Sequence, residues 1–169
     1  MDILDRLLGH DAWTTRQLLL RCRDLTDEQW RRRFDIGHET LQATFLHIVG
    51  NMEVWTDLIR GRPVRPEPQP IERTRSVDGL IERLDAAAPD FGAIARQLAD
   101  QGRLDETWVD TLDDPPTEKT YGGAIAHLIT HSMHHRGEVL HMLHRLGVPN
   151  LIEGDLLSWE RERVGDVGA

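Results

Sequence analysis

The chain has 169 residues, of which 39% are hydrophobic and 29% are charged, a balance typical of a globular protein rather than a disordered one. Its formal net charge of -9 repels phosphate backbones, so we expect no nucleic-acid partner. The sequence shows no long apolar run and no signal peptide, and we expect a cytoplasmic protein without a membrane partner. The single cysteine, Cys22, lies late in a helical pattern, which favours a small buried side chain over a reactive thiol.

The N-terminal part of the chain predicts one long helix followed by a short one. Apolar residues recur at helical spacing over about residues 2–22, and no proline interrupts them. Thr26 is followed three residues later by Gln29, which is the pattern of a capping box. A short helix should therefore begin after Thr26.

A second long helix should begin after Thr40, a good N-cap residue, and end at Gly61. The residues that follow, up to Pro70, include several prolines, which cannot continue a helix. We expect the stretch 61–70 to be a long extended connection with polyproline character.

The C-terminal half predicts two more long helices. Ser76 can cap the third, over about residues 77–101, and Thr120 can cap the fourth, which should end at Gly147. Between these two helices, residues 103–119 are ambiguous and suggest at most a short extended piece.

Four long helices, with a long connection between the second and the third, predict an all-α fold. We expect a four-helix bundle that forms a single domain over residues 1–169. A short tail helix at about residues 153–162 should pack on the bundle through Leu156, Leu157 and Trp159. Because the connections differ in length, a simple up-down-up-down order does not follow.

Nine histidines are many for a chain of this size, and most of them lie between residues 127 and 144. His131 and His135 are four residues apart on one face of the last helix, and such a pair can bind one metal ion. His127 lies one turn earlier, so the pair is either His127 with His131 or His131 with His135. A third ligand should come from another helix, and His47 is the best candidate because its sequence neighbours are mostly apolar. A helical protein whose histidines bind no metal is the alternative.

Three segments resemble the DinB/YfiT family of small helical metalloproteins, the damage-inducible family that is distinct from the DNA polymerase of the same name. They are residues 7–13, residues 40–61 with His47, and residues 131–137 with the pattern H-x-x-x-H-R-G. The resemblance covers roughly residues 1–148. It implies a four-helix bundle whose metal ligands are His47, His131 and His135.

The sequence also suggests roles for residues near the candidate metal ligands. The family often has glutamine where this chain has Glu138, whose carboxylate could orient a ligand histidine, act as an acid or base, or point to solvent. Glu138 is thus a weak candidate for a catalytic residue. We expect Arg136 to pair with a carboxylate of a neighbouring helix, Gly137 to permit close helix packing, and His38 to lie at the surface or a helix end.

Three neutral imidazoles leave at least one coordination position open, as in catalytic metal sites. Zn²⁺ or Ni²⁺ is expected, and Fe²⁺ and Mn²⁺ also suit nitrogen ligands. The resemblance implies a homodimer and a metal-dependent enzyme. That enzyme would be an S-transferase that uses a low-molecular-weight thiol, or a hydrolase, acting on a small-molecule substrate. Because no second catalytic group is evident in the sequence, a non-catalytic metal- or ligand-binding stress-response protein is the alternative.

Overall fold

The computed structural model describes residues 1–66 and 75–167, and this part of the chain is mostly helical. The helical class expected from the sequence is thereby confirmed. Four of the helices are long: α1 (Ile3–Arg21), α3 (Leu41–Ile59), α5 (Val77–Asp100) and α6 (Tyr121–Arg145). Among the described residues no helix combines the length and the apolar character needed to cross a membrane.

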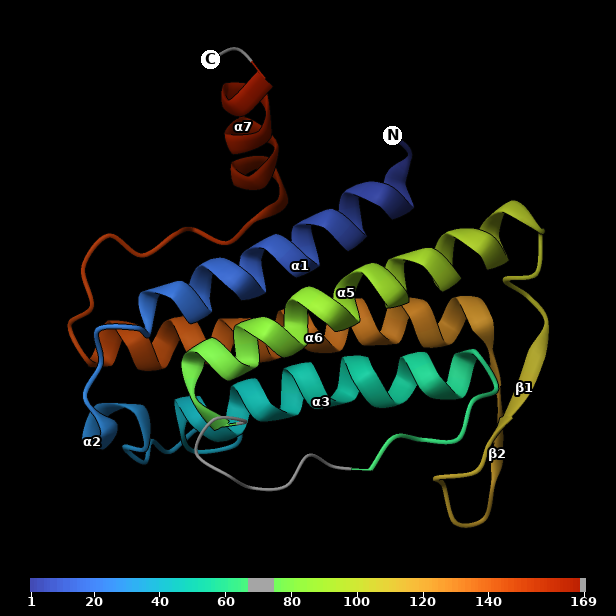
Figure 1. Ribbon diagram of the computed structural model, residues 1–169, viewed down its shortest axis with the longest axis horizontal. Coiled ribbons are helices and arrows are strands. Elements are labelled where there is room, and N and C mark those ends of the chain that lie inside the picture. The colour runs from blue at the N-terminus through green and yellow to red at the C-terminus, as the bar shows by residue number, and fades with distance from the viewer. Residues whose placement is uncertain (67–74, 168–169) are drawn as a thin grey trace.

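The long helices lie side by side, and α1 and α3 each pack against both α5 and α6 (Figure 1). In Figure 1, α1 and α6 run in one direction and α3 and α5 in the other. Since α5 is the next helix after α3 among the described residues and points the same way, the chain must return along the length of α3 before α5 can begin. This geometry gives the physical reason for the long connection that the sequence predicted.

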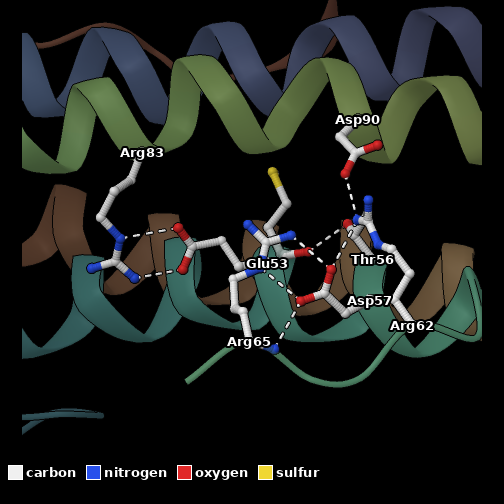
Figure 2. A network of polar contacts seen from close by, with 8 residues as sticks. Glu53, Thr56, Asp57, Arg62, Arg65, Arg83 and Asp90 are labelled. Carbon is white, nitrogen blue, oxygen red and sulfur yellow. Dashed lines mark hydrogen bonds and ion pairs between the residues drawn. The ribbon is translucent and has the colours of Figure 1, made fainter. Parts of the chain in front are cut away.

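The first residues of that connection are held to the helices by ion pairs (Figure 2). Arg65 donates from Nε and Nη2 to the two oxygens of Asp57, at 2.7 and 2.8 Å. Arg62 pairs with Asp57 at 2.8 Å and with Asp90 of α5 at 2.6 Å. The expected polyproline character of residues 61–70 falls partly outside the described residues, which stop at Pro66 and resume at Arg75.

Several helices begin directly after a residue whose side chain accepts a hydrogen bond from the first turn of the helix. Thr40 accepts a hydrogen bond from the Ala43 N–H at 3.0 Å, and Ser76 and Thr120 cap α5 and α6 in the same way. Thr26 and Gln29 form the complete predicted capping box at the short helix α2 (Asp27–Trp30). The cap residues predicted from the sequence are therefore confirmed.

The core lies between the inward faces of the four long helices. It includes fully buried side chains from each of them, among them Leu18, Phe45, Leu84 and Met142. Cys22 also lies in this core, 1% exposed, and burial raises the pKa of its thiol. The prediction of a buried, unreactive cysteine is confirmed.

A two-stranded antiparallel hairpin separates α5 from α6. Strand β1 (Thr107–Asp110) pairs with β2 (Thr117–Thr120), with Thr107 opposite Thr120. The sequence predicted at most one short extended piece here, because the polar residues of β2 carry no apolar alternation. Thr120 both ends β2 and caps α6, so the hairpin leads directly into the helix that carries most of the histidines.

The tail helix α7 (Leu156–Val167) begins later and runs further than the sequence predicted, and it packs against α1 (Figure 1). Trp159 is only 3% exposed and lies against Gly9 of α1, where a Cβ atom would clash with its ring. Leu157, by contrast, is 67% exposed, so the expectation that it packs on the helices was wrong. Trp159 is the main apolar anchor of this helix.

Candidate metal centre

Two neighbouring helices, α3 and α6, carry the histidines that the sequence singled out. The helices pack against each other along the molecule (Figure 1). His47 belongs to α3, and His131 and His135 lie one turn apart on α6. The fold thus brings together side chains that are 84 residues apart in the sequence.

The Nε2 atom of His131 lies close to the Nε2 atom of each of the other two histidines. His131 Nε2 lies 2.9 Å from His47 Nε2 and 3.2 Å from His135 Nε2. A hydrogen on His131 Nε2 could be donated to only one of these neighbours. A metal ion with bonds of about 2.0–2.1 Å would hold its nitrogen ligands about 3 Å apart, which is the spacing found here. The donor set therefore fits a metal ion.

A fourth imidazole, that of His38, lies over this cluster. Its ring is half-buried, and its centroid lies 4.0 Å from that of His47 and 5.0 Å from that of His135. One ring nitrogen from each of these three residues lies within 4.8 Å of the others, so this group also could hold a metal ion. The expectation of a surface position for His38 was wrong, because in a loop no periodicity indicates where a side chain points.

The loop that carries His38 approaches α6 very closely at Gly37. This glycine has a φ of +49°, and a Cβ atom there would overlap the carboxylate of Glu138. Glycine meets both requirements, since it lacks a side chain and tolerates a positive φ. The loop is closed by a hydrogen bond of 2.7 Å from the Phe34 N–H to the Glu39 carbonyl. His38 is thereby held against the histidine cluster.

Glu138 lies next to the cluster rather than in solvent, with only 8% of its surface exposed. Its Oε2 accepts a hydrogen bond from His135 Nδ1 at 2.8 Å, and its Oε1 lies 3.3 Å from Nε2 of His134. A proton on His135 Nδ1 leaves the Nε2 lone pair of the same ring free and directed toward His131. Of the three roles that the sequence left open, this geometry supports the orientation of a ligand histidine. His134, His135 and Glu138 also form a second group that could hold a metal ion.

Burial favours the uncharged form of three of these imidazoles, those of His38, His47 and His131. The pKa of His47 is lowered to about 4, first by burial and then by the neighbouring His38, His135 and His131 rings. Burial followed by nearby histidines also lowers the pKa values of His38 and His131. At neutral pH these rings are therefore neutral, which is the form that binds metal ions.

His127 lies beside the cluster but does not join it. Its ring stacks on that of His131, with centroids 5.1 Å apart and planes at 21°. By contrast, the rings of His131 and His135 are perpendicular, and their Nε2 atoms face each other. Of the two pairs left open by the sequence, His131 with His135 is the one whose Nε2 atoms face each other, and His131 Nε2 also lies close to His47 Nε2.

Two cavities border the histidines. One, of about 480 Å³, is lined by His47 and Asn51 of α3 and extends toward the connection before α5. The other, of about 490 Å³, is lined by Trp55, Lys119 and His127, at the end of the molecule where the hairpin meets α6. Both volumes fall in the range of small-molecule sites. The Asn51 amide nitrogen, 3.0 Å from His47 Nε2, connects the first cavity to the cluster.

Arg136 anchors the histidine-bearing helix to α1. Its Nη1 pairs with a carboxylate oxygen of Asp11 and donates to Ser132 Oγ at 2.7 Å, and both charged residues are almost fully buried. The expected pairing with a carboxylate of a neighbouring helix is confirmed. Gly137 is different: it is exposed, and a Cβ atom there would meet nothing within 4 Å. The expectation that it permits close packing was wrong, because it points away from the neighbouring helices.

The comparisons with known proteins agree with these features. The family model that matches this chain is described as the DinB family, and the match extends over residues 1–160, which include all the histidines of the cluster. Among curated proteins, none matches the chain.

Proposed function

Because this chain belongs to the DinB family, we propose that it is a metalloprotein with the four-helix-bundle fold expected for that family and one divalent transition metal ion. Its ligands are His47, His131 and His135. The observation that carries this proposal is the short spacing of His131 Nε2 from the other two rings, 2.9 Å to His47 Nε2 and 3.2 Å to His135 Nε2. Zn²⁺ or Ni²⁺ is the proposed ion, and Fe²⁺ and Mn²⁺ suit the same nitrogen donors.

His131 is preferred over His38 as the third ligand for a geometric reason. The His38 ring lies over the face of His47, with centroids 4.0 Å apart and planes at 38°. The rings of His47, His131 and His135 meet edge to face instead, at 65–90°. In addition, His131 Nε2 lies within 3.2 Å of the Nε2 atoms of both His47 and His135, a spacing typical of ligands that share one ion. His38 therefore covers the site in this proposal.

The chemistry follows from a site with three neutral ligands and at least one open coordination position. A bound divalent ion would supply Lewis acidity and lower the pKa of a thiol or a water molecule that reaches it. Within the chain, Glu138 fixes the orientation of His135 through the 2.8 Å hydrogen bond to Nδ1. The His38 loop and α6 limit the access of bulk water.

Thiol-dependent S-transfer is the reaction that the arrangement supports best. In this reaction a sulfur–carbon bond forms, the leaving group departs with its bonding electrons, and the thiol proton passes to solvent. The reaction needs room for two organic reactants, and two cavities of about 480 and 490 Å³ border the histidines. Hydrolysis requires one organic substrate and water, so it remains the second candidate at the same open position. The proposed partners are accordingly a low-molecular-weight thiol and a small-molecule electrophile.

The metal content of tag-free protein tests the site. We expect about one metal ion per chain by elemental mass spectrometry, and its loss in His47→Ala, His131→Ala and His135→Ala, because removing one of three ligands leaves too few donors. His144→Ala is the matched control, since its side chain is exposed in the last turn of the same helix. Retained metal in all three ligand variants, or none in the wild type after reconstitution, would refute the site. Loss of the metal in His38→Ala but not in His131→Ala would show that His38, and not His131, is the third ligand.

The reaction is tested separately, with metal-loaded protein, a panel of low-molecular-weight thiols and a generic electrophile. Conjugation that stops on chelation supports S-transfer. Turnover of esters or amides without any thiol supports the hydrolase. If neither class reacts while the metal is bound, the alternative of a non-catalytic metal- or ligand-binding protein replaces both enzymes.

A further inference from the structure

The cavity beside His47 is rich in arginine, although the chain as a whole is acidic. Arg65, Arg75 and Arg83 line it, and among the described residues that line it Glu53 is the acidic one. The formal net charge of the whole chain is -9. Arg65 pairs with Asp57 and Arg83 pairs with Glu53, so Arg75 is the lining arginine whose charge no carboxylate of the described residues balances. Such a positive charge attracts anions.

Two of these arginines are held by carboxylates of α3 (Figure 2). Arg83 of α5 donates from Nε and Nη2 to the two oxygens of Glu53 on α3, at 3.0 and 2.6 Å. Arg65 makes the corresponding pair of bonds to Asp57. Each guanidinium thus uses its Nε and Nη2 for structure, and Nη1 has no protein acceptor among the residues that the structure describes.

Arg75 is different, because its guanidinium has no carboxylate partner among the described residues. Its backbone is nevertheless fixed, since Gln42 of α3 donates from Nε2 to the Arg75 carbonyl at 3.2 Å. The side chain is half-buried and lines the cavity. A partly desolvated arginine without a partner is a strong binding point for an oxyanion, since its planar fork matches a carboxylate or a phosphate.

The rest of the lining is mostly apolar. Leu46 and Val54 of α3 face Val64 and Pro66 of the connection, and Leu112 of the hairpin closes one side. His47 and Asn51 border the same cavity, so one of its walls belongs to the metal centre. An occupant can therefore contact the arginines, the apolar wall and the metal-binding residues at the same time.

We propose that this cavity binds an organic anion, whose carboxylate or phosphate group pairs with Arg75 and whose apolar part lies along Leu46 and Val54. The Nη1 groups of Arg65 and Arg83, which have no acceptor among the described residues, can donate further hydrogen bonds to the anion while Nε and Nη2 keep their own partners. The anion is one of the two reactants of the metal site, and in this respect the inference rests on the proposed function. The recognition itself needs only the cavity.

The test uses metal-free, chelator-treated full-length protein and isothermal titration calorimetry. The probes are hexanoate, hexyl phosphate and hexylamine, which share an alkyl chain and differ in the charged group. We expect at least one of the two anions to bind and the amine not to bind. We expect Arg75→Gln to weaken anion binding by about tenfold or more, because a charge-assisted hydrogen bond is lost. The control Arg21→Gln, at an exposed position at the end of α1, should leave the affinity unchanged.

The tighter of the two anions identifies the oxyanion group. The inference is overturned if neither anion binds, if the amine binds equally well, or if Arg75→Gln matches the wild type while circular dichroism shows that it is folded. Because metal is absent, this result is separate from that of the metal analysis. A chain that binds metal but no anion refutes only the cavity, and one that binds anions but no metal refutes only the metal centre.

Discussion

Glu138 and His135 illustrate how a single contact defines a role at the scale of one residue. The Glu138 carboxylate is buried and accepts the Nδ1 hydrogen of His135 at 2.8 Å. We predict that Glu138→Ala weakens metal affinity by about 10–100-fold, because His135 loses the partner that fixes its orientation. Glu138→Gln should retain most of the affinity, since an amide oxygen can accept the same hydrogen bond. Competition with a chromogenic chelator measures both values.

The control for this prediction is Glu118→Gln, a change at an exposed position of β2 that should not alter metal affinity. A Glu138→Ala variant with wild-type affinity would show that Glu138 does not position His135. Equal losses in the alanine and glutamine variants would indicate that the charge of Glu138 matters rather than its hydrogen bond.

At the scale of secondary-structure elements, Gly137 weakens α6 without any compensating contact. Its backbone is helical, its position is exposed, and a Cβ atom would meet nothing within 4 Å. Gly137→Ala should therefore raise the free energy of unfolding by about 0.5–1 kcal/mol, through helix propensity and a less flexible unfolded chain. Urea unfolding measures this change. In the same helix, a Cβ atom at Gly122 would lie 3.0 Å from the Leu104 carbonyl oxygen, so Gly122→Ala should bring no gain.

The ion pairs of Asp57 attach the connection after α3 to the helices, and they make this attachment dependent on pH. Hydrogen bonds from Arg65 lower the pKa of Asp57 from 3.8 to about 2. Because the folded pKa lies below the unfolded one, the stabilisation is fully present above about pH 4 and is lost as the pH falls toward 2. Asp57→Asn should cost about 2 kcal/mol at pH 7, and the difference from wild type should shrink over that acidic range.

Urea titrations at several pH values test this prediction. Asp85→Asn is the matched control, because Asp85 forms an ion pair with Arg16 in which both side chains are largely exposed, at 51% and 43%. Exposed pairs of this kind contribute little, so the control should change stability by less than about 0.5 kcal/mol. A cost at Asp57 that is the same at pH 7 and near pH 2 would contradict the ionic explanation.

At the scale of the whole molecule, apolar side chains remain exposed around the first and last helices. Ile3 of α1 is 71% exposed and Leu157 of α7 is 67% exposed. We predict a homodimer, since contact with a second copy would remove such side chains from water. Sedimentation velocity at micromolar concentration should show the dimer, and Leu157→Glu should shift it toward the monomer. A wild-type chain that sediments as a monomer would refute the prediction.

Much of the fold could be predicted from the sequence because local chemistry determines it. The caps at Thr26, Thr40, Ser76 and Thr120 depend on residues within one turn, so they are visible in the sequence itself. The second strand of the hairpin was not predicted, because β2 is polar and forms by pairing with β1. The same direction of α3 and α5 also depends on packing between distant segments.

The sequence by itself determined the helical class, the N-terminal caps at Thr26, Thr40, Ser76 and Thr120, and the three histidines proposed as ligands, because local chemistry, helical spacing and a family pattern carry this information. Only the tertiary structure decided that His38 covers the cluster, that Glu138 contacts His135, and that Arg75 lines a cavity beside His47. These features join a loop, two helices and a connection that are far apart in the chain. Packing between these segments determines their contacts, and neither local residue spacing nor helix propensity predicts such packing.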